Sequence, residues 1–207
     1  YFVRGLKDTA SAVRLCVRIF LRFSETEKSG NRMKISLNWL KEYVPVEIDY
    51  NTLAEKLTMA GTAVEETIPF SIPQGIVVSE IKERRPHPNA DKLSVCTVFD
   101  GERDWQVVCG APNCDAGQKV PLAKIATVFR DKQSGKDFKI EKREIRKVVS
   151  EGMLCGAQEL GFEEKSEGLL ILDSSIPCGK PLNEIYPDDV VLDLEITPNR
   201  PDLLSHI

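Results

Sequence analysis

Apolar positions in the first part of the chain recur at the spacing of short helices. Each of two sets would lie on one face of a helix. The first set is Trp39, Leu40 and Tyr43, and the second is Leu53, Leu57 and Ala60. We expect helices over 37–43 and 51–60. Ser36 is in position to cap the first, and Asp49 or Asn51 to cap the second, because their side-chain oxygens accept from free N–H groups at a helix start.

The spacing then changes from helical to alternating. Gly61 is expected to end the second helix, and residues 62–68 alternate as a strand does. Pro69 and Pro73 mark a linker after it. Most of the following residues are predicted to be strands, over 76–81, 93–99, 105–109, 119–126, 138–149 (a strand pair or one long hairpin arm) and 168–172.

Turn signals separate these strands. Pro86 and Pro88 interrupt regular structure around His87, and Asp100-Gly101 is a hairpin signal. Residues 150–160 are expected to form a capped helix that Gly161 ends, with 152–154 closing one end of the barrel. Short strands about ten residues apart, with one small helix, are typical of a compact closed barrel of the OB type.

A later strand is predicted outside this barrel. Residues 190–196 alternate, and we expect them to pair with the strand at 62–68. The fold class is therefore α+β: an OB-type β-barrel of about five strands plus a short helix, inserted in a small split α/β domain.

Composition excludes a membrane protein and a uniformly basic one. Of 207 residues, 42% are hydrophobic, no run approaches the roughly 20 apolar residues of a membrane span, and the net charge is −4. Positive charge is instead local: residues 130–147 carry eight Lys and Arg. A basic stripe on a neutral body is typical of phosphate binding, although a charge run is also typical of a solvated surface. The RNA-binding candidates are Lys92, Arg130, Lys132, Lys136, Lys139, Lys142, Arg143, Arg146 and Lys147.

The chain offers no catalytic or metal-binding constellation. Its six cysteines form no C-x-x-C pair, and its two histidines lie far apart in the sequence. Cys109 has apolar neighbours that would not favour a thiolate nucleophile. An esterase or metal hydrolase therefore lacks a site, and reduced thiols indicate a cytosolic protein.

Another set of polar and glycine positions is assigned to turns and caps rather than to chemistry. Asn and Asp side chains close turns, and glycine permits tight ones. Lys92 lies beside one such turn and is in reach of an RNA phosphate. The set comprises His87, Asn89, Asp91, Gly110, Asn113, Ser150, Gly152, Asn199 and Asp202.

The two ends of the chain differ from the rest. Residues 1–32 place Arg14, Arg18 and Arg22 on one helical face, which fits either a basic presequence or a leader without a role in the fold. We expect the second, a disordered or artefactual leader. The turn before Ile207 suggests that more chain follows, so that this is the front piece of a longer protein.

Several segments occur in an order that resembles the start of the bacterial phenylalanyl-tRNA synthetase β subunit. They cover residues 33–207, and seven matches in one order form a specific signal. The segments are Met33-Lys34-Ile35-Ser36 with Trp39-Leu40, Met59-Ala60-Gly61, His87 to Leu93, Cys109 to Asn113, Ser150 to Cys155, Glu159-Leu160-Gly161, and Thr197 to Arg200 with Asp202.

The resemblance implies a domain plan and a function. Residues 33–69 and 186–207 would form the split N-terminal domain, and 70–185 the OB-fold tRNA-binding domain. The parent enzyme, a cytoplasmic α₂β₂ tetramer, joins phenylalanine to tRNA(Phe) with ATP and Mg²⁺. Its catalytic, editing and metal-binding residues would lie outside these 207 residues, so no catalytic residue, cofactor or metal ligand is assigned here.

One alternative and one departure from the family remain. A free-standing OB-fold tRNA-binding protein or synthetase accessory factor shares the barrel, but it has no need of the flanking domain or of the segment 197–202. The family usually has glycine where this chain has Lys147. If that position has a positive φ, Lys147 accepts strain or distorts the turn, while its charge would favour RNA.

Overall fold

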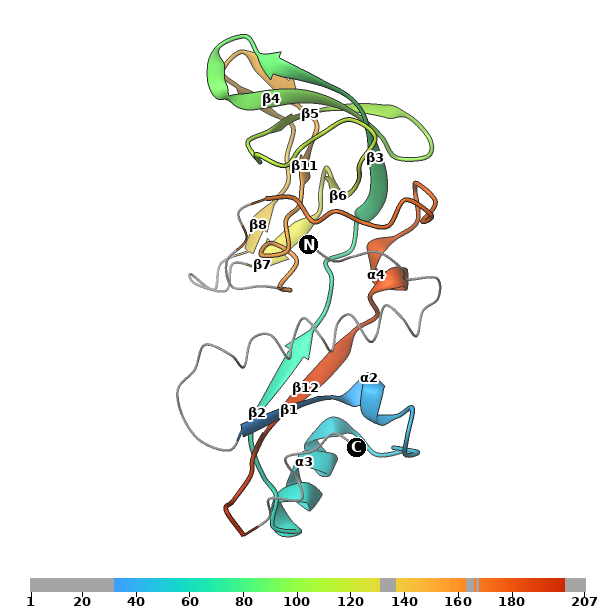
Figure 1. The fold of residues 1–207 in the computed structure, drawn as a ribbon, viewed down its shortest axis with the longest axis vertical. Coiled ribbons are helices and arrows are strands. Elements are labelled where there is room, and N and C mark those ends of the chain that lie inside the picture. Colours follow the sequence, from blue (N-terminus) through green and yellow to red (C-terminus); the bar gives the residue numbers. More distant parts are fainter. Residues whose placement is uncertain (1–31, 131–136, 163–165, 167, 200–207) are drawn as a thin grey trace. The chain divides into compact units, whose positions relative to one another are not determined.

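The computed structural model describes residues 32–130, 137–162, 166 and 168–199 (Figure 1). The described chain forms two compact units. Ile72–Tyr186 makes one of them, here called the barrel unit. The segments before Ile72 and after Tyr186 make the other, here called the flanking unit, so the barrel unit is inserted between two parts of the flanking unit.

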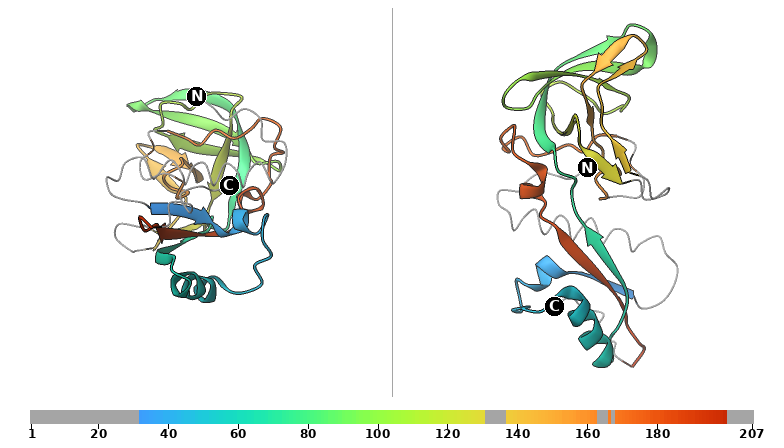
Figure 2. Two further views of the ribbon diagram at one scale, coloured as in Figure 1. Left: turned by 60° about the horizontal axis from the view of Figure 1, so that its bottom comes forward. Right: turned by 180° about the vertical axis from the view of Figure 1, so that it is seen from behind.

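Five antiparallel strands build the barrel unit, and Figure 2 shows them from two further sides. Their sheet order is β11-β6-β3-β4-β5. The strands are β3 (Ile76–His87), β4 (Ala90–Phe99), β5 (Asp104–Cys109), β6 (Lys119–Lys124) and β11 (Gly152–Leu154). The two outer strands approach each other, because the N–H of Glu151, just before β11, donates to the carbonyl of Gln106 in β5 at 2.8 Å. The sheet is thus a nearly closed barrel, and the predicted fold class is confirmed.

The barrel core follows from the alternation of side chains along each strand. Successive residues of a strand point to opposite faces, so every second position faces the interior. Fully buried aliphatic residues from four strands meet there, and they include Ile81, Val98, Val107, Val120 and Leu122. Cys96, Cys109 and Cys114 pack among them as small apolar groups.

Two small hairpins replace the predicted strand arm at 138–149. β7 (Val128–Arg130) pairs with β8 (Asp137–Lys139), and β9 (Arg143–Ile145) pairs with β10 (Val148–Ser150). Ile140 is buried between the hairpins and exchanges backbone hydrogen bonds with Ala126 and Thr127 at 2.8 Å each. The basic stripe at 130–147 is therefore divided over two hairpins.

The predicted helix at 150–160 is wrong. Ser150 ends β10, and residues 152–154 form β11, which pairs with β6. The local reason is Gly152: a Cβ there would lie 2.8 Å from the carbonyl oxygen of Ala123, so the backbones of β11 and β6 approach more closely than any other residue would allow. The short helix of the barrel unit is instead α4 (Leu182–Ile185).

The predicted strands at 76–81 and 168–172 also differ from the structure. β3 continues through Pro86 to His87. Beyond Glu80 it pairs with β4 alone, so the missing N–H of Pro86 disrupts no ladder on its open side. Residues 168–172 make only isolated bridges, through Leu169 and Leu172.

Three strands and two helices form the flanking unit. β12 (Asp189–Glu195) lies between β1 (Arg32–Ser36) and β2 (Ala63–Phe70), which confirms the predicted pairing of the segments around 62–68 and 190–196. Their buried apolar residues, with partners from α3, form a small core around Met33, Leu192, Leu194 and Ile196.

Side-chain caps hold both helices of the flanking unit. Ser36 Oγ accepts from the N–H of Trp39 at 3.1 Å and starts α2 (Leu37–Leu40). Asp49 starts α3 (Tyr50–Met59). It accepts from the hydroxyl of Thr52 and from the backbone N–H groups of Thr52 and Asn51, and these bonds lower the pKa of Asp49. Gly61 follows α3 with a φ of 93°, a conformation that favours glycine. In the described part of the chain, helices are too short or too polar to cross a membrane.

Asp100 holds the turn between β4 and β5, and it gives a testable prediction. It is 1% exposed, accepts from the N–H groups of Glu102 (3.0 Å) and Arg103 (2.9 Å), and pairs with Lys124 at 2.7 Å. Burial alone would raise the pKa of Asp100, but these partners outweigh burial and hold it below the ordinary value.

We expect Asp100→Asn to lower the free energy of unfolding at pH 7 by about 1–3 kcal/mol, because the half-buried Lys124 loses its charged partner and two backbone N–H groups lose a charged acceptor. A depressed carboxyl pKa stabilises the fold above the unfolded pKa of about 4, and this contribution is lost as pH falls through the folded pKa. The difference in free energy of unfolding between the variant and wild type, measured by urea unfolding, should therefore be smaller at about pH 2.5 than at pH 7. The exposed Glu102→Gln is the matched control; an equal difference at both pH values would contradict the prediction.

Candidate nucleic-acid interface

Two hairpin turns meet at one end of the barrel. His87 ends β3, and its Nδ1 accepts from the N–H of Asn89 at 3.0 Å. Nε2 therefore carries the proton and donates to the carbonyl of Ile145 in β9 at 3.1 Å. The buried imidazole thus joins the β3–β4 turn to the β9–β10 hairpin through hydrogen bonds.

Asn89 and Arg146 strengthen the same contact. Asn89 Nδ2 donates to the carbonyl of Arg146 at 3.0 Å, and a guanidinium nitrogen of Arg146 donates to the carbonyl of Asn89 at 3.2 Å. With the two His87 bonds they form a set of hydrogen bonds that we call the turn clasp. His87 and Asn89, which the sequence assigned to a turn, thus both donate from the β3–β4 turn to backbone carbonyls of the β9–β10 hairpin.

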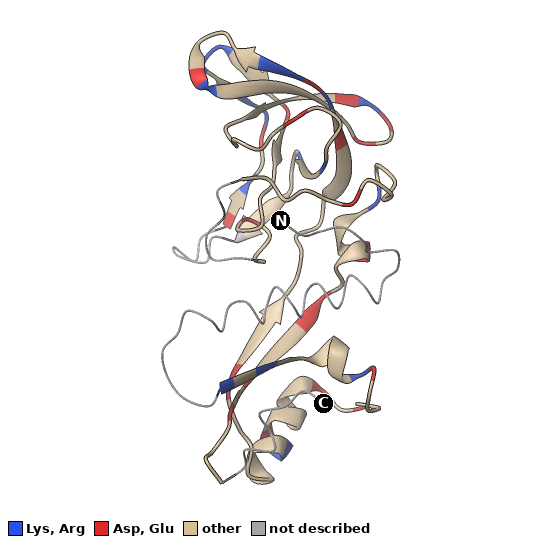
Figure 3. Ribbon diagram, viewed as in Figure 1, with Lys and Arg blue, Asp and Glu red and all other residues tan. Residues whose placement is uncertain are grey.

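The turn clasp brings basic residues from separate hairpins to one end of the barrel unit. Lys92, Arg143, Arg146 and Lys147 are all exposed there. Figure 3 shows Lys and Arg positions on both hairpins at this end of the barrel unit. Within the described residues, these four side chains form no ion pair with a carboxylate. Their positive charge is therefore open to an anion.

Arg146 and Lys147 form the β9–β10 turn itself. Their φ angles are 48° and 70°, so both adopt the left-handed conformation of a type I′ hairpin turn. This turn type favours glycine at its second central position, where the resembled family has it. Lys147 therefore adopts the turn conformation and accepts the strain, which is one of the two outcomes expected from the sequence.

The other basic candidates lie elsewhere or are neutralised. Lys142 pairs with Glu151 at 2.7 Å, a bond that lowers the pKa of Glu151. Lys139 is exposed on β8. Arg130, in β7, lies opposite Asp137 of β8 in the strand register. Lys132 and Lys136 lie outside the described residues. The structure therefore brings together only part of the predicted basic arm and adds Lys92 to that part.

Aromatic residues near the basic hairpins are mostly covered. Trp105 is buried beneath the guanidinium of Arg103, 3.6 Å from its ring centre, and Phe129 is buried as well. Phe138 is 44% exposed and stacks on Phe129 with ring centres 5.3 Å apart. Within the described barrel unit, only one aromatic ring is therefore exposed, and phosphate contact fits this surface better than base reading does.

The remaining turn residues hold the barrel together. Ser150 Oγ accepts from the N–H of Val108 at 3.0 Å and donates to the carbonyl of Gly152, also at 3.0 Å. Asn113 pairs through its amide with the N–H and carbonyl of Leu169 at 2.8 and 3.0 Å. Gly110 follows β5 with Leu93 close to it.

Three further predicted residues take less part. Asp91 and Asn199 are exposed, and Asp202 lies outside the described residues. The described chain holds no group of three or more His, Cys, Asp or Glu side chains that would bind a metal ion. Sequence reasoning missed Arg84, which bonds Ser94 at 3.1 Å and Asp115 at 2.9 Å, because its partners come from distant segments.

This architecture, an OB-type barrel with basic hairpin turns at one end, defines a nucleic-acid-binding class of domain. Residues 76–181 match the family described as a putative tRNA binding domain. The match covers half of the chain, and the chain belongs to this family.

Relatives extend the comparison beyond the barrel. The phenylalanine–tRNA ligase β subunit of Chlorobaculum tepidum is 46% identical over 178 residues, which is 84% of this chain and 22% of that protein. The β subunit of Hahella chejuensis is 47% identical over 175 residues, with the same coverage. The predicted resemblance is confirmed, and the chain spans about a fifth of these relatives' length.

Solved structures give a weaker likeness. A MetRS-related protein from Pyrococcus horikoshii is 18% identical with a TM-score of 0.39, and the match covers 53% of this chain and 88% of that one.

Strain at Lys147 gives a prediction on stability. Lys147→Gly should raise the free energy of unfolding by about 0.5–1 kcal/mol, because glycine adopts a φ of 70° without the penalty that a Cβ brings. Lys139→Gly removes the same charge from the extended backbone of β8 and should lower it instead. Chemical denaturation of both variants measures the two signs; a loss of stability in Lys147→Gly would contradict the strain.

Proposed function

We propose that this chain is the tRNA-binding and assembly portion of a phenylalanine–tRNA ligase β subunit. The observation that carries this proposal is the identity of 46% over 178 residues with such a subunit. The aligned length exceeds the 76–181 match, so the likeness includes the flanking unit as well as the barrel.

The parent enzyme then attaches phenylalanine to tRNA(Phe) in the cytoplasm. It would use ATP and Mg²⁺ and would consist of two β subunits and two α subunits. The described residues of this chain offer no cluster of ligands that fits Mg²⁺, so we assign ATP and Mg²⁺ to other parts of the enzyme. This chain contributes RNA contacts and a docking surface, and no bond is made or broken on it.

Within the barrel, we assign the first RNA contacts to Lys92, Arg143, Arg146 and Lys147. Four exposed cations without carboxylate partners attract a phosphate backbone, and the turn clasp supports their positions. OB barrels commonly bind oligonucleotides at the loops between their first and second strands and between their fourth and fifth strands. In this barrel these loops are the β3–β4 turn and the segment between β6 and β11, which contains the β9–β10 hairpin. A second set of candidate RNA contacts lies in the adjacent segment 130–142 of the sequence, and it consists of Arg130, Lys132, Lys136, Lys139 and Lys142.

A free-standing tRNA-binding protein or accessory factor is the alternative. It would account for residues 76–181 but not for the flanking unit. In that unit β12, which follows the barrel in the sequence, completes a sheet with β1 and β2, which precede the barrel. A barrel acting alone has no need of this sheet, and this favours the ligase subunit.

Binding to tRNA tests the surface. Lys92→Gln together with Lys147→Gln should weaken tRNA(Phe) binding about tenfold or more. The slope of log affinity against log salt should fall by about 1 for each phosphate that the double variant no longer binds. Fluorescence anisotropy over a series of salt concentrations measures both. The control pair, Lys41→Gln with Lys56→Gln, removes the same charge from exposed positions of the flanking unit.

Equal losses of affinity in the two pairs would show that only net charge matters and would reject the assigned surface. Affinity that does not fall as salt rises would reject phosphate binding as a whole.

The activity of the whole ligase gives a separate test. This chain alone should not aminoacylate tRNA(Phe) in the presence of ATP, Mg²⁺ and phenylalanine. In the full α₂β₂ enzyme, the Lys92→Gln and Lys147→Gln pair should raise KM for tRNA more than it lowers kcat, because the residues bind RNA away from the reacting atoms. Charging of tRNA by the chain without an α subunit would overturn the assignment.

A further inference from the structure

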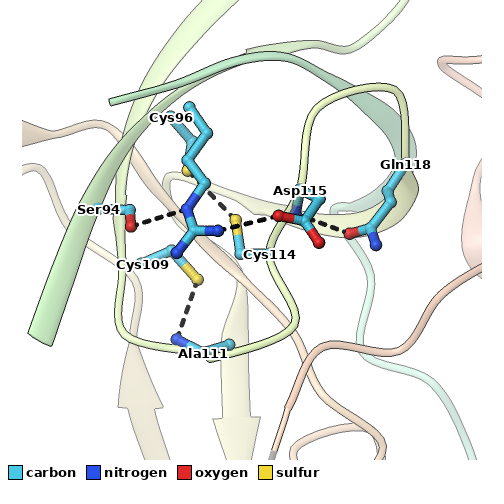
Figure 4. Close-up of polar contacts among 8 residues, drawn as sticks. Ser94, Cys96, Cys109, Ala111, Cys114, Asp115 and Gln118 are labelled. Carbon is cyan, nitrogen blue, oxygen red and sulfur yellow. Dashed lines mark hydrogen bonds and ion pairs between the residues drawn. The ribbon is translucent and has the colours of Figure 1, made fainter. Parts of the chain in front are cut away.

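Three thiols meet in the core of the barrel unit. Cys96 comes from β4, Cys109 ends β5, and Cys114 lies in the loop between β5 and β6. Figure 4 shows them around one point, where the sulfur atoms of Cys96 and Cys114 are 3.3 Å apart. Cys109 also hydrogen-bonds Cys114, and its sulfur accepts from the N–H of Ala111 at 3.4 Å. All three are reduced.

Metal binding does not account for this cluster. Within the described chain no group of three or more such ligands is arranged to bind a metal ion. Core packing buries the three small side chains and brings the sulfurs of Cys96 and Cys114 within hydrogen-bond distance, 3.3 Å. A disulfide has a bond length of about 2.05 Å, so a shift of about 1.2 Å between the sulfurs would join Cys96 to Cys114.

Of these two thiols, Cys96 is the one whose pKa its surroundings lower. The hydrogen bond between the thiols of Cys114 and Cys96 lowers the pKa of Cys96 against the effect of burial. The bond of Cys114 with Cys109 lowers the pKa of Cys114, but the bond to Cys96 and burial outweigh this and raise it to about 11. The guanidinium of Arg84 lies close enough to favour the thiolate form of each.

Arg84 also fixes the loop that carries Cys114. It donates to Ser94 Oγ in β4 at 3.1 Å and to Asp115 at 2.9 Å, and Asp115 directly follows Cys114. The N–H of Asp115 in turn donates to the side chain of Gln118 at 2.9 Å. These contacts hold the loop against β4, which keeps the two sulfurs together before any bond forms (Figure 4).

We propose that Cys96 and Cys114 are a redox modification site that hydrogen peroxide converts to a disulfide. The sulfur of Cys96 attacks the O–O bond and takes one oxygen as a sulfenic acid, and the first water leaves. The sulfur of Cys114 then displaces the hydroxyl from Cys96 and gives up its proton, which releases the second water. Two thiols and one peroxide thus give one disulfide and two waters, and a dithiol reductant reverses the change.

A cleft of about 290 Å³ gives peroxide a route toward the cluster. Cys109 lines this cleft together with Val108, Met153 and Leu154, while Cys96 and Cys114 are fully buried and do not line it. Access then depends on small local openings, so the reaction is slower than oxidation of the partly exposed Cys178. The product ties β4 to the loop after β5.

The experiment uses the full chain with Cys16→Ser and Cys178→Ser, which removes two thiols outside the cluster. The folded protein is treated with hydrogen peroxide, blocked with N-ethylmaleimide and digested without reductant. Mass spectrometry should find the peptides of Cys96 and Cys114 joined, with a loss of two hydrogens. The midpoint of thermal unfolding should rise by several degrees, because the bond constrains the unfolded chain, and dithiothreitol should reverse the rise.

Three variants separate the proposal from its alternatives. Cys96→Ala should abolish both the joined peptides and the rise, whereas Cys155→Ala removes a buried thiol outside the cluster and should change neither. Cys109→Ala should keep the joined peptides. Loss of the product in Cys109→Ala would show that Cys109 supplies the bond. Joined peptides that form only in urea would show that the fold does not create the site, and either result would overturn the proposal.

Discussion

Closure of the barrel at Ser150 is the constraint on which the rest of the barrel unit depends. The hydroxyl of this one residue accepts from the N–H of Val108 and donates to the carbonyl of Gly152. The next residue, Glu151, bonds Gln106 through its N–H. These bonds occupy the backbone groups that β5 would otherwise leave open as an edge, and unpaired edges are costly and prone to association.

Closure also sets the positions of the basic residues. Once Ser150 is fixed against β5, the β9–β10 hairpin that precedes it must return toward the end of β3. There the buried His87 and the side chain of Asn89 bind its turn. The cations on both turns therefore belong to a rigid part of the barrel, and an RNA phosphate would meet side chains whose backbone is already ordered.

The thiol cluster depends on closure in a different way. Cys96, Cys109 and Cys114 are small, and they fill the interior where β4 and β5 approach the loop before β6. Arg84 spans the same elements from outside, through Ser94 and Asp115. Ordinary core packing has thus placed reactive groups at a distance from which covalent bonding needs little movement.

The sequence by itself determined several of the strands, the helix caps and the family. Alternation and helical spacing are local properties, and Ser36, Asp49 and Gly61 act on backbone groups a few residues away. Tertiary structure decided what depends on contacts between distant residues. Gly152 lies in a strand because of Ala123, and Lys147 lies in a strained turn. The turn clasp brings Lys92 to the same surface as Arg146 and Lys147. The contact joins residues far apart in the sequence, so their spacing along the chain does not predict it.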